Sequence, residues 1–189
     1  MNPAPHLILV GPMGAGKSCI GRRLAAHFGL PFADADRAIE QRAGTSVTAI
    51  FDIEGEAGFR ARERATLAEI LGGNGGVLLA TGGGAVLDAG NRRLLSERGF
   101  VVHLDVGVDQ QLHRLARDHT RPLLARVDRE QVLQDLAESR APLYAEIADL
   151  RFDTDHLSAA DAAARLATLV DRQWQRRPRA STGASERPA

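Results

Sequence analysis

Residues 11–18 have the sequence Gly11-Pro12-Met13-Gly14-Ala15-Gly16-Lys17-Ser18, and the prediction of the fold begins with them. They match G-x-x-x-x-G-K-[ST], in which glycine-rich backbone wraps phosphates, the lysine reaches the β- and γ-phosphates and the hydroxyl binds Mg²⁺. The apolar run His6–Val10 precedes the motif like a buried strand, and Lys17–Phe28 follows it with helical spacing of apolar residues. Because motif and flanks agree, we expect a phosphate-binding loop rather than an ordinary glycine-rich turn.

Outward from this loop, short apolar runs alternate with helical patterns along the chain. The expected strands are His6–Val10, Pro31–Ala33, Val77–Ala80, Phe100–Leu104 and Arg151–Thr154. The expected helices are Lys17–Phe28, Arg37–Ala43, two helices within Val47–Leu71 of which the second opens near Glu56, Asp88–Arg98, Val108–Arg117, Arg129–Tyr144 with a break at Pro142, and Ala159–Trp174. This alternation predicts an α/β fold with a parallel sheet.

Composition limits the classes of protein that the chain can belong to. Its 189 residues carry 24 Lys+Arg and 24 Asp+Glu, and Lys17 is the only lysine. The balanced charge disfavours non-specific binding to nucleic acid or membrane, and no apolar run is long enough to span a bilayer. With one cysteine, Cys19, there is no disulfide framework. We expect one soluble cytoplasmic domain over residues 1–174 and a disordered tail over residues 175–189.

Two aspartates at the end of a predicted strand are candidates for substrate and metal chemistry. Asp34 and Asp36 are two residues apart, a spacing that puts both side chains on one side of a strand. At the carboxyl edge of a parallel sheet they would face the phosphate loop. One could hold Mg²⁺ through water and the other could orient or deprotonate an acceptor hydroxyl. The alternative is structural, with Asp36 as a helix N-cap and Asp34 as a turn residue.

Arginines supply the other candidates. Arg60 and Arg64 share one face of a predicted helix while Arg62 points elsewhere, and periodicity alone cannot select a functional one. A solvent-exposed face is favoured by the acidic residues on the same helix, Glu56, Glu63 and Glu69. Arg121 lies in a polar, proline-interrupted stretch that is either a lid over the transferred phosphate or a surface loop. Arg140 would lie where the chain changes direction before Pro142.

Glycines, histidines and the cysteine complete the candidates. Thr81-Gly82-Gly83-Gly84 follows a buried strand and either permits close approach of a ligand or forms a plain flexible turn. Cys19 is expected to be a small packed residue rather than a redox switch. The histidines lack the spacing of a zinc site and are expected to be structural or surface groups.

Taken in order, these segments resemble the shikimate kinase family, in the nucleoside-monophosphate-kinase branch of P-loop proteins. The resemblance extends from His6 to about Val170. It rests on five ordered features, which are Gly11–Ser18, Phe32–Asp36, Gly58-Phe59-Arg60 with Glu63, Thr81–Gly84, and Arg121–Leu124 with Arg140–Tyr144. Apart from the first, each is weak alone, but five in order are specific.

The resemblance implies a three-layer α/β/α fold with a five-stranded parallel sheet in the order 2-3-1-4-5 and a lid over about residues 117–127. It implies that Lys17, Asp36 and Arg121 are catalytic. The implied ATP-binding residues are Gly14, Ala15, Gly16, Lys17, Ser18, Cys19, Arg114, which would stack near adenine, and Arg121. The implied shikimate-binding residues are Asp36, at the acceptor hydroxyls, Arg60 and Arg140, at the carboxylate, and Gly82, Gly83 and Gly84, along the ring. Ser18 and Asp34 would hold one Mg²⁺ per subunit.

The activity implied by the resemblance is ATP-dependent phosphorylation of the 3-hydroxyl of shikimate, in the pathway to chorismate and aromatic amino acids. The expected partners are ATP and shikimate, and the expected state is a monomer. Alternatives are a gluconate-type or other small-molecule P-loop kinase, since fold does not fix substrate, and a non-catalytic nucleotide-binding module. The presence of Asp34, Asp36 and Arg121 beside Lys17 favours an enzyme over the binding module.

Overall fold

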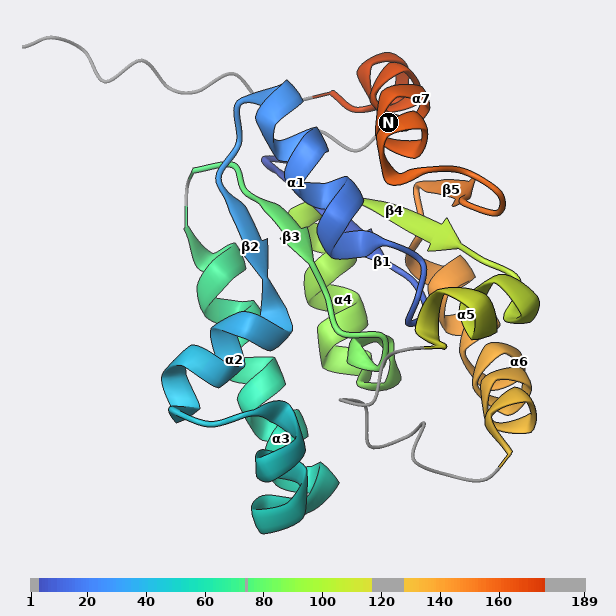
Figure 1. The fold of residues 1–189 in the computed structure, drawn as a ribbon. Helices are drawn as coiled ribbons and strands as arrows, with labels where there is room; N and C mark the ends of the chain where they lie inside the picture. The colour runs from blue at the N-terminus through green and yellow to red at the C-terminus, as the bar shows by residue number, and fades with distance from the viewer. Residues whose placement is uncertain (1–3, 74, 117–127, 176–189) are drawn as a thin grey trace, which may run out of the picture.

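The computed structural model describes residues 4–73, 75–116 and 128–175. Within these residues, one parallel sheet has the strand order β2-β3-β1-β4-β5, as predicted (Figure 1). The strands are β1 His6–Val10, β2 Phe32–Asp34, β3 Leu78–Ala80, β4 Gly99–Asp105 and β5 Leu150–Asp153. The helices are α1 Lys17–Phe28, α2 Ala35–Ala43, α3 Val47–Gly72, the 3₁₀-helix η1 Ala85–Leu87, α4 Ala89–Arg98, α5 Val108–Leu115, α6 Arg129–Ile147 and α7 Ala159–Gln173.

Helices cover both faces of the sheet, so that the central strand is buried throughout (Figure 1). On one face, Leu7 and Leu9 of β1 pack in a cluster with α1 and α7. On the other face, Ile8 and Val10 pack in a cluster with α3, α4 and α6. Because side chains alternate along a strand, an uninterrupted apolar run such as His6–Val10 is required where both faces are covered. This arrangement confirms the predicted three-layer α/β/α architecture.

Helix α3 bends at Gly55, as the prediction of two helices required. Gly55 has φ 69° and ψ −177°, which lies outside the helical region and in a part of conformational space that favours glycine. The second segment begins at the next residue, Glu56. It carries Arg60 and Glu63 toward the sheet edge described below.

Helix α6 corrects one prediction, because it passes through Pro142 without ending there. The chain therefore does not change direction at Arg140, which lies inside the helix and is buried. Proline lacks the N–H that a helix interior uses, but tertiary packing of an apolar face outweighs such a local loss. Here Tyr144 and Ile147, both beyond the proline, are buried in the core against the sheet.

The described ends of the chain meet at the amino edge of the sheet. Trp174 follows α7 and donates a buried hydrogen bond from Nε1 to the carbonyl oxygen of Ala4, at 3.0 Å. Its ring contacts the edge of Phe28 at the end of α1, with centroids 5.6 Å apart. Since Ala4 precedes β1, this contact lies at the opposite end of the strand from residues 11–18.

Two predicted segments fall on residues that the structure does not describe. The predicted lid, residues 117–127, and residues 176–189 of the predicted tail lie outside the described residues. Among the residues that are described, no helix combines the length and apolar character that crossing a membrane requires.

Candidate functional site

The loop Gly11–Ser18 joins β1 to α1, where the motif predicted it. Gly11 and Gly16 have φ values of 141° and 89°, and a Cβ on Gly11 would lie 2.2 Å from the carbonyl oxygen of Leu104, so the loop needs glycine there. The amine of Lys17 lies within the curve of the loop and donates to the carbonyl oxygens of Gly11, at 2.7 Å, and Pro12, at 2.8 Å. A cation and the N-terminus of α1 thus face the same small space, which suits phosphate.

Ser18 and Asp34 form an oxygen-rich pair beside the loop. The Ser18 hydroxyl donates to Asp34 Oδ2 at 2.6 Å. Asp34 ends β2 and caps α2, because its Oδ1 accepts from the backbone N–H of Arg37 at 3.3 Å. A hydroxyl and a carboxylate are the hard oxygen donors that Mg²⁺ prefers, so these residues fit that ion. Over the described part of the chain, no cluster of three or more His, Cys, Asp or Glu side chains could hold a metal by itself.

The geometry of the two aspartates corrects the sequence prediction in two respects. Asp34, not Asp36, is the N-cap, and Asp36 lies in the first turn of α2 rather than on the strand. The two carboxylates therefore do not share a strand face, and the strand spacing argument was wrong. Asp36 nevertheless lies at this edge of the sheet, since a Cβ on Gly82 would be 2.8 Å from its Oδ1.

The three glycines after β3 face four charged side chains. A Cβ on Gly82 would lie 2.8 Å from Asp36 Oδ1 and 3.1 Å from Glu63 Oε1. A Cβ on Gly84 would lie 2.4 Å from Arg60 Nη2, and one on Gly83 would lie 3.7 Å from Arg140 Nη1. These side chains come from α2, α3 and α6, which are far apart in sequence. The structure thus brings together two carboxylates and two guanidinium groups around one stretch of bare backbone.

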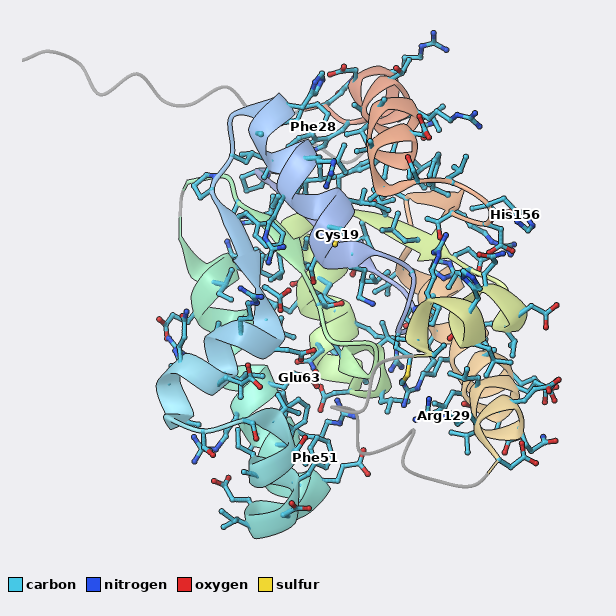
Figure 2. All side chains as sticks on the ribbon, viewed as in Figure 1. Cys19, Phe28, Phe51, Glu63, Arg129 and His156 are labelled. Carbon is cyan, nitrogen blue, oxygen red and sulfur yellow. The ribbon has the colours of Figure 1, made fainter. Side chains whose placement is uncertain are left out.

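Glu63 is a member of this site that the sequence interpretation placed wrongly on an exposed face. The residue is fully buried on α3, and its Oε2 accepts from Arg60 Nη1 at 2.7 Å (Figure 2). Burial raises the pKa of Glu63, and the charge of Arg60 offsets part of this effect. Its spacing from the buried residues Phe59 and Leu67, four positions away on either side, was the signal that could have placed it on the inner face.

The other two arginines of α3, Arg62 and Arg64, are at the surface. Arg62 donates to both carboxylate oxygens of Glu54, at 2.9 and 2.7 Å, and Arg64 pairs with Asp88 at 3.2 Å. The side chain of Arg60 is only 16% exposed, compared with 41% for Arg62 and 49% for Arg64. The structure therefore separates Arg60 from its neighbours, which periodicity could not do.

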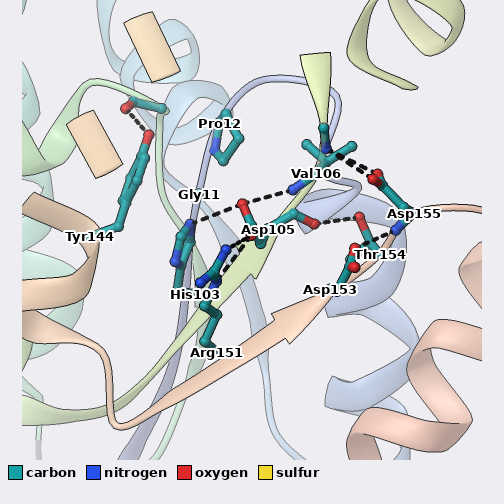
Figure 3. A network of polar contacts seen from close by, with 12 residues as sticks. Gly11, Pro12, His103, Asp105, Val106, Tyr144, Arg151, Asp153, Thr154 and Asp155 are labelled. Atoms are coloured by element: carbon teal, nitrogen blue, oxygen red, sulfur yellow. Dashed lines mark hydrogen bonds and ion pairs between the residues drawn. The ribbon is translucent and has the colours of Figure 1, made fainter. Parts of the chain in front are cut away.

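Tyr144 is a further residue at the site, and no pattern in the sequence predicted its contacts. Its hydroxyl donates to the carbonyl oxygen of Gly83 at 2.6 Å (Figure 3). Its ring stacks on the buried ring of His103, with centroids 4.7 Å apart and planes at 22°. Burial raises the pKa of Tyr144 to about 12, and burial lowers the pKa of His103.

On the other side of the loop, Arg114 connects the phosphate loop to the end of β5. Its Nη1 donates to the Gly14 carbonyl oxygen at 2.9 Å and to Thr154 Oγ1 at 3.1 Å, and its Nη2 donates to the Thr154 carbonyl oxygen at 2.5 Å. Thr154 Oγ1 in turn donates to the carbonyl oxygen of Asp105 at 2.9 Å (Figure 3). Arg114 is therefore held at the rim of the loop, whereas its predicted stacking on adenine stays a prediction.

Two predictions about single residues remain. Cys19 is exposed on α1, so the expectation of a small packed residue is wrong (Figure 2). Arg121, the predicted lid residue, lies outside the described residues.

Comparison with known proteins gives one consistent result. The family model described as "Shikimate kinase" matches residues 13–171. The chain is 62% identical over 176 residues to shikimate kinase of Stenotrophomonas maltophilia strain K279a, covering 93% of this chain and 97% of that protein. It is 58% identical over 175 residues to shikimate kinase of Xanthomonas campestris pv. campestris strain 8004, with the same coverages.

Solved structures agree with the sequence comparison. The structure of shikimate kinase from Acinetobacter baumannii in complex with shikimate superposes with a TM-score of 0.86 at 44% identity, covering 89% of this chain and 94% of that one. Shikimate kinase from Bacteroides thetaiotaomicron superposes with a TM-score of 0.81 at 32% identity, covering 88% and 98%. By its family match, its relatives and its fold, this chain belongs to the shikimate kinase family.

Proposed function

We propose that the chain transfers the γ-phosphate of ATP to the 3-hydroxyl of shikimate, giving shikimate 3-phosphate and ADP. One observation carries the proposal, namely that Gly82, Gly83 and Gly84 face two carboxylates, of which Glu63 is paired with Arg60, and two guanidinium groups beside a phosphate-binding loop. Shikimate has complementary chemistry, because it is a small ring with one carboxylate and several hydroxyls. The relative from Acinetobacter baumannii, 44% identical, was solved with this compound bound.

In this proposal the two guanidinium groups bind the carboxylate of shikimate. Planar guanidinium groups match a carboxylate with paired, charge-assisted hydrogen bonds. Arg60 is held in place by Glu63, and Arg140 is buried, so both lose little conformational freedom on binding. Asp36, beside Gly82, accepts hydrogen bonds from the ring hydroxyls and orients the 3-hydroxyl toward the loop. The backbone of the three glycines lines the ring.

ATP occupies the other half of the proposed site. Backbone N–H groups of Gly14, Ala15 and Gly16 surround the phosphates, together with those of Ser18 and Cys19 at the start of α1. The amine of Lys17 exchanges its two loop carbonyls for β- and γ-phosphate oxygens. Arg114 lies beside the base, and Arg121 acts on the transferred phosphate.

Ser18 and Asp34 are the residues that we assign to Mg²⁺, one ion per subunit. Their oxygen atoms are already 2.6 Å apart in a hydrogen bond and face the loop, so they need little rearrangement to serve as donors. The ion would neutralise charge on the phosphates during transfer. We also propose that the chain acts as a monomer and that this ATP-dependent reaction takes place in the cytoplasm.

The domain boundaries form part of the same proposal. We propose one catalytic domain over residues 1–174, with a lid at about residues 117–127 and a tail over 175–189 that the reaction does not need. The family model ends at residue 171, close to the proposed boundary.

A coupled assay of ADP release tests the function directly. Shikimate should support turnover, whereas gluconate and nucleoside monophosphates at equal concentration should not, and ³¹P NMR should show a single ester at the 3-position. Turnover with gluconate but not with shikimate would favour the gluconate-type alternative. ATP binding without turnover on any acceptor would indicate a nucleotide-binding module instead.

A further inference from the structure

Gly83 is the point at which the phosphate loop, the glycine segment after β3 and helix α6 come together. A Cβ on Gly83 would lie 3.6 Å from both the Gly11 carbonyl oxygen and the Met13 nitrogen, and 3.7 Å from Arg140 Nη1. The carbonyl oxygen of Gly83 accepts a 2.6 Å hydrogen bond from the hydroxyl of Tyr144. A displacement of Gly83 would therefore shift its contacts with the phosphate loop, which we assign to ATP, and with Arg140, which we assign to shikimate.

Arg140 is the charged group nearest to this point. It lies one helical turn before Tyr144 on α6, and its positive charge lowers the pKa of the phenol against the larger effect of burial. Arg140 is 7% exposed, and its Nε is buried without a hydrogen-bond partner, so this atom does not help to fix the side chain. The Tyr144 hydroxyl thus bonds the Gly83 backbone at the position that Arg140 Nη1 also faces.

The ring that carries this hydroxyl is fixed in turn by His103. The imidazole on β4 stacks on the Tyr144 ring, and a Cβ on Gly11 would lie 3.5 Å from His103 Cδ2, which places the imidazole against the start of the phosphate loop (Figure 3). Asp105 and Arg151 lie on its polar side, with Asp105 Oδ1 4.0 Å from Nε2, and Lys17 contributes a further positive charge. Burial keeps the pKa of His103 low, so that the stacked ring is neutral.

We propose that Tyr144 is a positioning residue for the acceptor substrate, whose hydroxyl sets the distance between the Gly83 backbone and the Arg140 guanidinium group while His103 holds its ring. The inference rests on the proposed function, which assigns Gly83 and Arg140 to shikimate. It goes beyond that function because Tyr144 need not touch either substrate. A purely structural tyrosine would affect stability alone, whereas a positioning residue affects the affinity for one substrate.

The substitution Tyr144→Phe isolates the hydroxyl, since the ring remains to stack on His103. We expect the KM for shikimate to rise about fivefold to tenfold, the equivalent of one hydrogen bond, while the KM for ATP changes less than about twofold. Trp174→Phe is the matched control, because it also removes a buried hydrogen bond to a backbone carbonyl, but at the amino edge of the sheet. It should lower stability and leave both KM values unchanged.

A spectroscopic measurement keeps the inference testable if Tyr144→Phe folds poorly. Tyr144 is the only tyrosine in the sequence, so biosynthetic labelling with 3-fluorotyrosine gives a single ¹⁹F signal. Saturating shikimate should shift this signal in the full-length protein, and the shift should be lost in Arg140→Ala. A signal that does not respond to saturating shikimate would overturn the positioning role.

The outcomes separate this inference from the function on which it rests. If shikimate is not phosphorylated, or if Arg140→Ala leaves the KM for shikimate unchanged, the assignment of the site fails and the inference fails with it. If Arg140→Ala raises that KM and Tyr144→Phe does not, only the role of Tyr144 is overturned. Equal increases in both KM values for Tyr144→Phe would also overturn it, because they would indicate general damage to the loop.

Discussion

A single methyl group at Gly84 should selectively weaken shikimate binding. In Gly84→Ala the new Cβ would lie 2.4 Å from Arg60 Nη2, 2.8 Å from Nη1 and 2.9 Å from Cζ. To regain an ordinary contact of about 3.5 Å, the guanidinium group must retreat by roughly 1 Å. The backbone at Gly84, with φ −98° and ψ 1°, is accessible to alanine, so the substitution acts through Arg60 and not through the turn.

The size of the effect follows from the contacts of Arg60. Its Nη1 is anchored on the buried Glu63 at 2.7 Å, so the guanidinium group cannot shift by this amount and keep the position that we assign to carboxylate binding. Loss of a charge-assisted hydrogen bond costs about 1.5–3 kcal/mol. Since about 1.4 kcal/mol corresponds to tenfold in affinity, the KM for shikimate should rise by about 10- to 100-fold, with the KM for ATP unchanged.

Initial rates of ADP release, with each substrate varied in turn, measure both constants. Gly72→Ala is the matched control, since a Cβ there would meet no atom within 4 Å, and it should behave like the wild type. Thermal melts establish that both variants are folded. A KM for shikimate within twofold of the wild type in folded Gly84→Ala would refute the assignment of Arg60 to the carboxylate.

Four further outcomes are expected. Lys17→Ala should reduce kcat by about 10³-fold while circular dichroism shows an intact fold, and substantial remaining turnover would contradict the phosphate assignment. Glu63→Gln should raise the KM for shikimate because it releases Arg60. Since burial raises the pKa of Glu63 in the folded chain, the wild type should also lose stability relative to this variant as pH rises through that pKa. Urea unfolding at a series of pH values measures this loss. Tyr144, with a pKa of about 12 in the folded chain and about 10 when unfolded, should show little tyrosinate absorbance at 295 nm near pH 11 until the chain unfolds. Its contribution to stability should be lost as pH rises from about 10 to 12. Removal of residues 175–189 should leave kcat and both KM values within twofold, and loss of activity would show that the tail is needed.

The sheet and its order were predictable because the decisive signals are local. The motif at Gly11–Ser18 identified the first strand and helix. The central strands β1, β3 and β4 are buried and are nearly continuous apolar runs, which can be recognised without knowledge of their neighbours. The edge strands β2 and β5 contain charged residues and are only partly buried, so the alternation with helices marked them. The five ordered segments then indicated the strand order, which the parallel pairings of β1 with β3 and β4 confirm.

The rest depends on contacts between segments that are distant in sequence. Glu63 is buried because Arg60 partners it and the second segment of α3 turns that face inward; its spacing from Phe59 and Leu67 indicates the face, but not the partner that allows a carboxylate there. Pro142 is tolerated because residues on both sides of it pack against the core. The contact of Tyr144 with Gly83 spans 61 positions and leaves no periodic trace in the sequence. Local patterns therefore supplied the framework, and tertiary packing determined which charged groups meet.

The hydrogen bond from Trp174 to Ala4 has a practical consequence for handling this enzyme. Both described ends of the chain lie on the side of the sheet opposite the substrates. Attachment to a solid support beside this contact would leave the reactive side facing the solution. The proximity of Ala4 and Trp174 also suits circular permutation, in which a short peptide joins these two positions and new ends are opened in an exposed segment such as the bend at Gly55.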